Sequence, residues 1–149
     1  MIGALRGQAE RDVRPGLVSS SHPGVAVGGR AGTLLAMARD MTPEERRAFL
    51  SDGTRTGKLA VADASGAPHV VPVWFVLDGD DVLFNCGASS LKARAIARDP
   101  RVALVVDEEV PPYAFVLLKG EVEVSDDVEA MLPWSTEIGG RYMGPDRAE

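Results

Sequence analysis

The feature that most constrains the fold is the apolar run from His69 to Leu77, which contains no charged residue. A strand-length run with no polar face predicts a strand that is covered on both sides. Asp78-Gly79-Asp80 follows and predicts a tight turn, and residues 81–86 predict the next strand. Two strands joined by so short a turn must run antiparallel. The sequence therefore favours an antiparallel sheet.

The remaining segments predict a small barrel with helices at its margins. Strands are predicted at 56–63, 69–77, 81–86, 101–107 and 113–124, and helical segments at 42–53, 90–99, 128–132 and 135–142. Pro133 is expected to separate the last two helical segments. Closure into a barrel would remove the edges that such apolar strands expose. We therefore predict an α+β fold that is mainly antiparallel, with five strands in a closed or partly closed barrel.

The first 36 residues differ from the rest of the chain. They contain 7 of the 16 glycines and no aromatic residue. A segment of this composition buries too little apolar surface to offset the entropy lost on ordering. We expect residues 1–36 to form a disordered extension and residues 37–149 to form a single folded domain.

Composition excludes several classes of function. The net charge of −6, from 16 basic and 22 acidic residues, argues against a nucleic-acid-binding protein. No apolar run approaches the roughly 18 residues of a membrane span, and no signal peptide is recognisable, so we expect a cytoplasmic protein. Cys86 is the single cysteine, and His22 and His69 lie far apart, so no metal site is expected.

The strongest local signal runs from Cys86 to Arg94. A strand ends at a glycine, Ser89 and Ser90 follow, and a helix then begins. Free N–H groups and the helix dipole favour an anion at such a point. Lys92 lies in the first turn, where the dipole disfavours a cation unless an anion is bound. The alternative is an ordinary serine-capped helix whose Lys92 and Arg94 are solvated.

Two further positions suggest a binding site. Pro72 interrupts the apolar strand, and proline occurs there only at an edge, a bulge or a split. A split would leave a slot with Trp74 as a wall for a planar ring, whereas the alternative is an edge-strand proline with Trp74 in the core. Lys58, next to Gly57, suits a phosphate, although it also fits a solvated strand end, and the spacing is not that of a P-loop.

The chain offers an anion site and an aromatic slot, but no recognisable acid, base or nucleophile. The predicted domain contains one histidine, His69, and no paired carboxylates inside an apolar run. A redox cofactor reconciles these observations, because it carries the chemistry while the protein supplies position and electrostatics.

Four segments, 54–60, 66–75, 89–94 and 98–104, resemble the pyridoxamine 5′-phosphate oxidase-like family, whose fold is the FMN-binding split β-barrel. They are most similar to the branch of that family that uses the deazaflavin coenzyme F420. The similarity is collinear over about residues 41–147. Members of the family usually continue past the final helix into another strand, so the resemblance also leads us to expect a trimmed barrel or a shortened chain here.

The resemblance implies a homodimer with two cofactor sites at its interface. It implies that Ser89, Ser90 and Lys92 hold the cofactor phosphate and that Lys58 and Arg94 assist. The ring would lie along Val70, Val71, Pro72, Val73 and Trp74. The resemblance further implies that Tyr113 approaches from the partner subunit and that Trp134 or Tyr142 closes the pocket.

The activity implied is hydride transfer from reduced F420 to a small unsaturated or quinone-like acceptor. No catalytic residue is assigned. Two alternatives stay open: an FMN-dependent oxidoreductase or oxidase of the same fold, and a non-catalytic coenzyme-binding protein. Both coenzymes carry a phosphate, so the anion site does not separate them.

Overall fold

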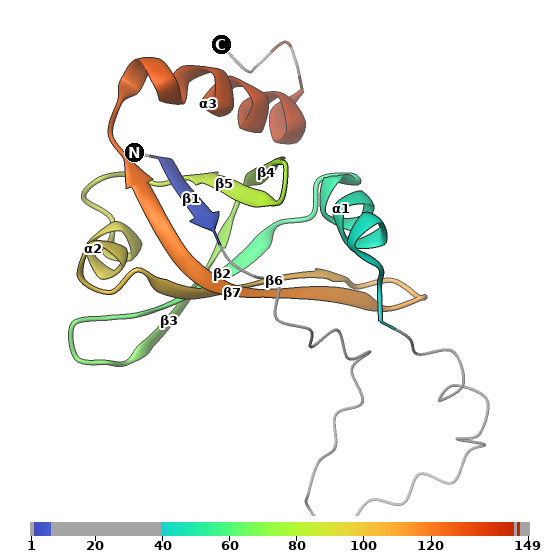
Figure 1. Cartoon of the computed structure of the whole chain (residues 1–149), viewed down its shortest axis with the longest axis horizontal. Coiled ribbons are helices and arrows are strands. Elements are labelled where there is room, and N and C mark those ends of the chain that lie inside the picture. Colours follow the sequence, from blue (N-terminus) through green and yellow to red (C-terminus); the bar gives the residue numbers. More distant parts are fainter. Residues whose placement is uncertain (1, 7–39, 145, 147–149) are drawn as a thin grey trace, which may run out of the picture.

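The computed structural model describes residues 2–6, 40–144 and 146, which form one curled antiparallel sheet with three helices (Figure 1). The elements are β1 (Ile2–Arg6), α1 (Pro43–Ser51), β2 (Gly57–Ala62), β3 (Pro68–Val73), β4 (Phe75–Asp78), β5 (Asp81–Asn85), α2 (Leu91–Arg98), β6 (Arg101–Glu108), β7 (Ala114–Ser125) and α3 (Val128–Met143). The prediction of a mainly antiparallel split β-barrel with short flanking helices is confirmed.

The strand order explains why the barrel is split. Neighbouring strands follow the order β3-β2-β6-β7-β1-β5-β4, and every pair is antiparallel. The two edge strands, β3 and β4, are consecutive in the chain and are separated only by Trp74. The sheet therefore curls until its two edges meet at Trp74. We call this junction the seam, and the chain crosses it from β3 to β4.

The apolar run 69–77 is divided at this seam. The prediction of one strand covered on both faces was wrong, because Val70 in β3 is 59% exposed and Trp74 is 43% exposed. Val76 in β4 is buried, as predicted for the second half of the run. A run of apolar residues does not distinguish a covered face from an apolar face that stays open.

The N-terminal prediction also fails for its first residues. Ile2–Arg6 form β1, which pairs with β5 on one side and with β7 on the other. A Cβ at Gly3 would lie 2.9 Å from atoms of Phe84 and Val122, so only glycine fits there. Neighbours from distant parts of the chain order this strand, which its own composition does not predict. The rest of the predicted extension lies outside the described residues.

The hydrophobic core lies inside the curl. Its most deeply buried side chains come from β2, β4, β5, β6 and β7, and they include Leu59, Phe75, Phe84, Leu104, Val106 and Val116. The helices lie beside β4 and β5 and at the ends of the barrel, and in the described part none covers the lower face of β3, β6 and β7 (Figure 1). Helix α1 begins with the expected capping box, in which Thr42 and Glu45 bond each other's backbone amides at 3.2 and 2.8 Å.

Helix α3 is longer than predicted. The chain continues as one helix through Pro133, where the sequence predicted a break. Pro133 removes only one intrahelical donor, whereas Trp134, Ile138 and Tyr142 recur every four residues and pack onto β4 and β5. This packing outweighs the lost hydrogen bond. None of the helices in the described part is long and apolar enough to cross a membrane.

Candidate functional site

The start of α2 forms the corner that the sequence singled out. Ser90 is the N-cap, and its Oγ accepts a hydrogen bond from the Ala93 amide at 3.2 Å. The amides of Leu91 and Lys92 precede the first intrahelical hydrogen bond, which Arg94 donates to the Ser90 carbonyl. Gly87, just before the corner, faces open space. The corner therefore presents N–H groups and the positive end of the helix dipole to a small open region.

Lys92 is the cation of this corner. It is half-buried, and it forms no hydrogen bond or ion pair within residues 2–6, 40–144 and 146. Its charge acts on the buried thiol of Cys86: burial raises the pKa of Cys86, and the nearby Lys92 ammonium partly opposes this shift. A half-buried ammonium without a carboxylate partner suits an anionic ligand.

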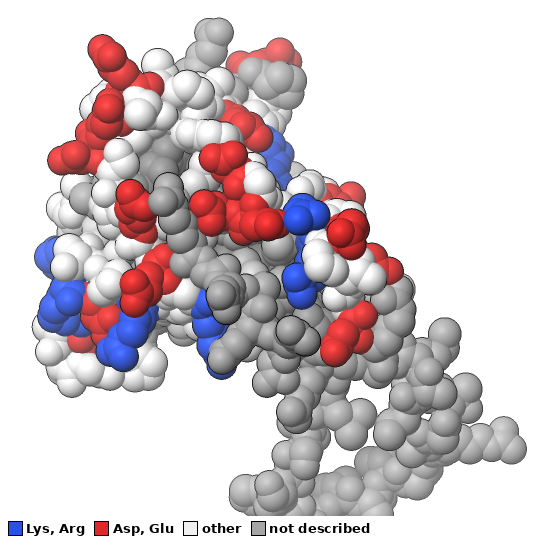
Figure 2. Space-filling view, in the orientation of Figure 1, with Lys and Arg blue, Asp and Glu red and all other residues white. Residues whose placement is uncertain are grey.

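Arg94 and Arg98 extend the positive charge along α2. Arg94 donates to the Ser89 carbonyl at 2.7 Å, and Arg98 donates to the carbonyls of Ala62 and Asp63. A cavity of about 400 Å³ lies between this face of α2 and the turn between β2 and β3. Figure 2 shows Lys and Arg side chains, with some Asp and Glu among them, on the left side where α2 lies, whereas Asp and Glu dominate the upper part of that view. The charged lining of the cavity consists of Arg94, Arg98 and Asp63, so two guanidinium groups face one carboxylate.

The second predicted anion position is already paired. Lys58 Nζ lies 2.5 Å from Asp107 Oδ1, and both side chains are 36% exposed. Arg55, three residues earlier, donates to Glu108 at 2.7 Å and 3.0 Å. Lys58 stands at the start of β2, whereas α2 contacts its far end, about four residues or ~13 Å away. Lys58 is therefore engaged by Asp107 at the opposite end of β2 from the point where Arg98 of α2 contacts that strand.

Strand β3 presents an apolar stripe on the uncovered face. Val70, Pro72 and Trp74 are exposed, while Val71 is half-buried and Val73 is buried on the opposite face. The stripe begins directly after the turn that packs on α2. The stripe therefore approaches α2 at its Val70 end, whereas Pro72 pairs with Lys58 further from the helix.

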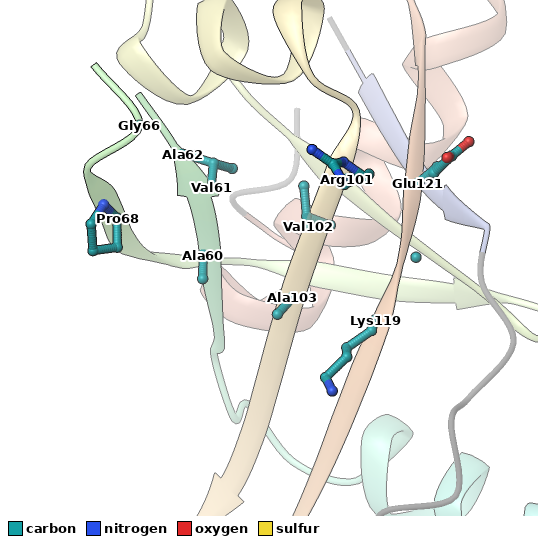
Figure 3. Close-up of a pocket in the computed structure, with 11 residues that line it drawn as sticks. Ala60, Val61, Ala62, Gly66, Pro68, Arg101, Val102, Ala103, Lys119 and Glu121 are labelled. Atoms are coloured by element: carbon teal, nitrogen blue, oxygen red, sulfur yellow. The ribbon is translucent and has the colours of Figure 1, made fainter. Parts of the chain in front are cut away.

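A hollow of about 630 Å³ continues this face across β2, β6 and β7 (Figure 3). Its floor consists of small side chains, among them Ala60, which pairs with Val70 and with Ala103. Arg101, Lys119 and Glu121 line its side toward β7. The hollow is an open, mostly apolar surface and does not include the start of α2.

Trp74 is held from one side by Tyr142 of α3. The two rings stack with centroids 5.1 Å apart and an interplanar angle of 2°. Tyr142 Oη accepts a hydrogen bond from the Phe75 amide at 3.3 Å and donates one to the Arg55 carbonyl at 2.8 Å. Burial raises the pKa of Tyr142. Trp74 is therefore not a core residue, contrary to the alternative considered for it, and its ring lies at the seam.

Several contacts of the site have no local sequence signal. The sequence did not single out Arg55, Asp107 or Arg141. Each of them takes its role from a partner at least 49 residues away or from backbone carbonyls. Tyr113, on the loop between β6 and β7, is 71% exposed. Trp134 of α3 packs against Val76 and Leu83. Within the described residues, no three His, Cys, Asp or Glu side chains are grouped to hold a metal.

Comparison with known proteins identifies the family. The family model described as pyridoxamine 5′-phosphate oxidase matches residues 42–148. The chain belongs to this family. The match covers the whole barrel from α1 onward and includes α2, β3 and the seam, so the family resemblance expected from the sequence is confirmed. A comparison with curated proteins gave no significant match.

Solved structures of similar fold support the assignment to the pyridoxamine 5′-phosphate oxidase family. A conserved hypothetical protein of Mycobacterium tuberculosis is 28% identical with a TM-score of 0.65, over 70% of this chain and 66% of that chain. A protein named F420 reductase is 32% identical with a TM-score of 0.54, over 64% of this chain and 75% of that one. A Bacteroides thetaiotaomicron protein described as a candidate 5-nitroimidazole antibiotic resistance protein, 19% identical with a TM-score of 0.57 over 68% of each chain, shares the fold. The chain spans just under two thirds of the first of these proteins.

Proposed function

We propose that this member of the pyridoxamine 5′-phosphate oxidase family is an F420-dependent oxidoreductase. The observation that carries the proposal is Lys92, a half-buried cation at the start of α2 that has no partner among the described residues. The similarity to a protein named F420 reductase, at 32% identity, favours the deazaflavin coenzyme. The substrate would be a small unsaturated or quinone-like acceptor.

The residues present fit such a coenzyme. Lys92 would bind the phosphate together with the first amides of α2, and Ser89 lies beside them. Ser90 already uses its hydroxyl oxygen as the helix cap, so it would contribute only its O–H donor. Arg94 is exposed and lies two residues after Lys92, so it would meet further negative charge of the ligand. Lys58 would assist only after giving up its contact with Asp107.

The stripe on β3 would bind the ring. Val70 and Pro72 present apolar surface without a charged group, and Trp74 adds an aromatic ring at the seam. When bound, reduced F420 supplies a hydride from its deazaflavin ring to the acceptor, which takes a balancing proton from solvent. The chain's own residues would orient the two partners, and this role requires no acid or base from the protein.

The same proposal includes a homodimer. The uncovered face of β3, β2, β6 and β7 carries exposed Val70 together with half-buried Val105 and Leu117. Charged side chains, among them Arg101 and Lys119, border these apolar residues, and an apolar patch with a polar rim is typical of a surface that another protein covers. A second copy on this face would enclose the β3 stripe and complete the ring site.

Two alternatives have specific support. The family description itself names pyridoxamine 5′-phosphate oxidase, which favours FMN, and the anion corner would suit the FMN phosphate equally well. A coenzyme-binding protein without catalysis is the other candidate, because the described residues of the site include no group that the structure arranges as an acid or a base.

A titration distinguishes these proposals. The purified full chain is titrated with F420 and, separately, with FMN, and coenzyme fluorescence is followed. We expect F420 to bind and FMN to bind at least tenfold more weakly; the reverse order would select the FMN enzyme. Turnover of reduced F420 with a quinone acceptor then separates an enzyme from a carrier. Binding of neither coenzyme would reject the proposed function.

A further inference from the structure

The seam between β3 and β4 needs contacts from another element to hold it in place. The two strands lie at opposite edges of the sheet, so no ladder hydrogen bonds join them where the chain crosses from one to the other. Trp74 is the only residue between them. Without a further contact, rotation about the backbone at this residue would move its indole relative to the β3 stripe.

Helix α3 supplies these contacts through two consecutive residues, Arg141 and Tyr142. Arg141 donates to three backbone carbonyls, those of Leu50 at 2.7 Å, Phe75 at 2.9 Å and Gly53 at 3.0 Å. Its guanidinium also lies 4.7 Å from the centre of the Phe75 ring. Arg141 thereby ties β4 to α1 and to the loop that follows α1, and it makes no ring contact with Trp74.

Tyr142 connects the same elements differently, because it contacts the indole itself. Its hydroxyl bonds the Phe75 amide and the Arg55 carbonyl, which fixes the phenol between β4 and the segment that leads into β2. Its ring covers one face of Trp74, at 5.1 Å and nearly parallel. The stack occupies one side of the indole, yet Trp74 is still 43% exposed.

We infer that Tyr142 is a positioning residue that holds Trp74 so that the uncovered part of its indole forms a wall of the ring site on β3. The inference rests on the proposed function and deepens it. By this inference, Tyr142 of α3 sets the position of the indole, although it is 68 positions further along the chain than Trp74. Tyr142 contributes nothing to the α2 corner. Since Tyr142 is already engaged within the same chain, it does not act as a mobile lid over the pocket.

The test separates the stack from the hydrogen bonds. Tyr142→Phe keeps the ring and loses both hydrogen bonds, whereas Tyr142→Leu loses both the ring and the hydrogen bonds. The chain has two tryptophans, so a Trp134→Phe background leaves Trp74 as the single emitter. Acrylamide quenching of Trp74, measured without coenzyme, then reports how well the indole is covered. F420 and FMN titrations report the ring site.

We expect Tyr142→Phe to keep the quenching constant of Trp74 and the coenzyme Kd within about twofold of wild type. Tyr142→Leu is expected to raise the quenching constant about twofold and to weaken coenzyme binding about tenfold, which is the scale of one aromatic contact. If Tyr142→Leu and Tyr142→Phe change both quantities equally, the positioning role is wrong and Tyr142 only fastens the fold.

A second variant keeps the inference testable if Tyr142→Leu does not fold. Trp74→Leu removes the same stack from the other side and leaves the hydrogen bonds of Tyr142 intact. It should weaken coenzyme binding about tenfold, and a Kd within twofold of wild type would contradict the inference. Where Tyr142→Leu does fold, the two losses should not add in the double variant, and additive losses would likewise contradict the inference.

The outcome also separates this inference from the proposed function. If wild type binds neither coenzyme while Tyr142→Leu still exposes Trp74 to acrylamide, the coenzyme assignment is wrong and the positioning of the indole stands. If wild type binds F420 or FMN and neither Tyr142→Leu nor Trp74→Leu changes its Kd, the coenzyme assignment stands and the role of Tyr142 is rejected.

Discussion

Two corners of the barrel carry the same local signature, a glycine near a strand end with a lysine close behind, yet the structure treats them differently. At the start of β2, Lys58 faces Asp107, and the neighbouring Arg55 faces Glu108. At the start of α2, Lys92 is half-buried and meets no carboxylate among the described residues. The comparison teaches that the availability of a cation depends on what lies across the sheet.

The carboxylates at the first corner come from a distant part of the chain. Asp107 and Glu108 end β6 and are separated from Lys58 and Arg55 by 49 and 53 residues. An anion that approaches Lys58 must compete with a carboxylate that is already in contact, whereas at Lys92 it meets the ammonium and the α2 dipole without a competitor. The α2 corner is therefore the better anion site.

The largest effect should separate the two lysines directly. We expect Lys92→Ala to weaken binding of F420, or of FMN if that is the coenzyme, by at least tenfold, equivalent to about 1.4 kcal/mol. Lys58→Ala should weaken it by about twofold or less, because Lys58 is committed to Asp107. The measurement is the Kd from fluorescence titration of the full-length variants.

Asp107→Asn provides the matched control for this pair. The substitution removes the competing charge and releases Lys58, so coenzyme affinity should stay equal or increase by about two- to threefold. Equal losses for Lys92→Ala and Lys58→Ala, or a strong loss for Asp107→Asn, would show that both corners contribute alike and would break the distinction.

Sequence reasoning located the α2 corner because its signals are local. A serine cap, a glycine and a lysine within six residues define the helix start, and the structure confirms Ser90 as the N-cap. The state of Lys58 was not predictable in this way, since the motif that contains it says nothing about Asp107. The resemblance named Tyr142 as a residue that closes the pocket, but the contacts of Tyr142 and Arg141 were not predictable, because backbone carbonyls of other elements define them.

The fold shows the same division between local and distant causes. Capping at Thr42 and the turn between β4 and β5 were predictable from neighbouring residues, and both elements form where expected. Strand β1 was not, because it is stable only between β5 and β7, which follow it by about 80 and 120 positions. Helix α3 continues through Pro133 because its contacts on β4 and β5 outweigh one lost hydrogen bond.

The two ion pairs of the β2 corner should differ in their effect on stability. Arg55 is 21% exposed and also donates to the carbonyls of Phe49 and Asp52 at 3.1 Å each. We expect Arg55→Met to lower the free energy of unfolding by about 2 kcal/mol, since several donors are lost from partly buried acceptors. Lys58→Ala should cost well below ~1 kcal/mol, as expected for a half-exposed pair. Urea unfolding of both variants measures the difference, and equal costs would contradict the assigned burial.

A smaller effect concerns the cap of the α2 corner. Ser90 Oγ accepts from the Ala93 amide, so Ser90→Ala should lower the free energy of unfolding by about 1 kcal/mol. Its effect on coenzyme Kd should remain below that of Lys92→Ala, because the cap oxygen is occupied within the helix. Thr42→Ala at the start of α1 is the matched control: it should cost a similar ~1 kcal/mol and leave the Kd unchanged. A Ser90→Ala loss in affinity as large as that of Lys92→Ala would make the hydroxyl a main phosphate ligand.

The smallest effect is a pH dependence confined to the β2 corner. The hydrogen bond from Arg55, and then that from the Val110 amide, lower the pKa of Glu108 below its ordinary value of 4.5. A carboxyl with a lowered pKa in the folded chain stabilises the fold fully above the pKa of the unfolded chain. This stabilisation is lost as pH falls through the pKa of the folded chain.

The stability difference between wild type and Glu108→Gln should therefore be constant from pH 7 to about 5 and shrink below about 4.5. Urea unfolding across this range measures it, with Glu109→Gln as control, since exposed Glu109 forms no ion pair with described residues. A Glu108→Gln difference that stays flat to pH 3 would mean that Arg55 does not hold Glu108 in solution, and the contrast between a paired and an available corner would then rest on Lys58 alone.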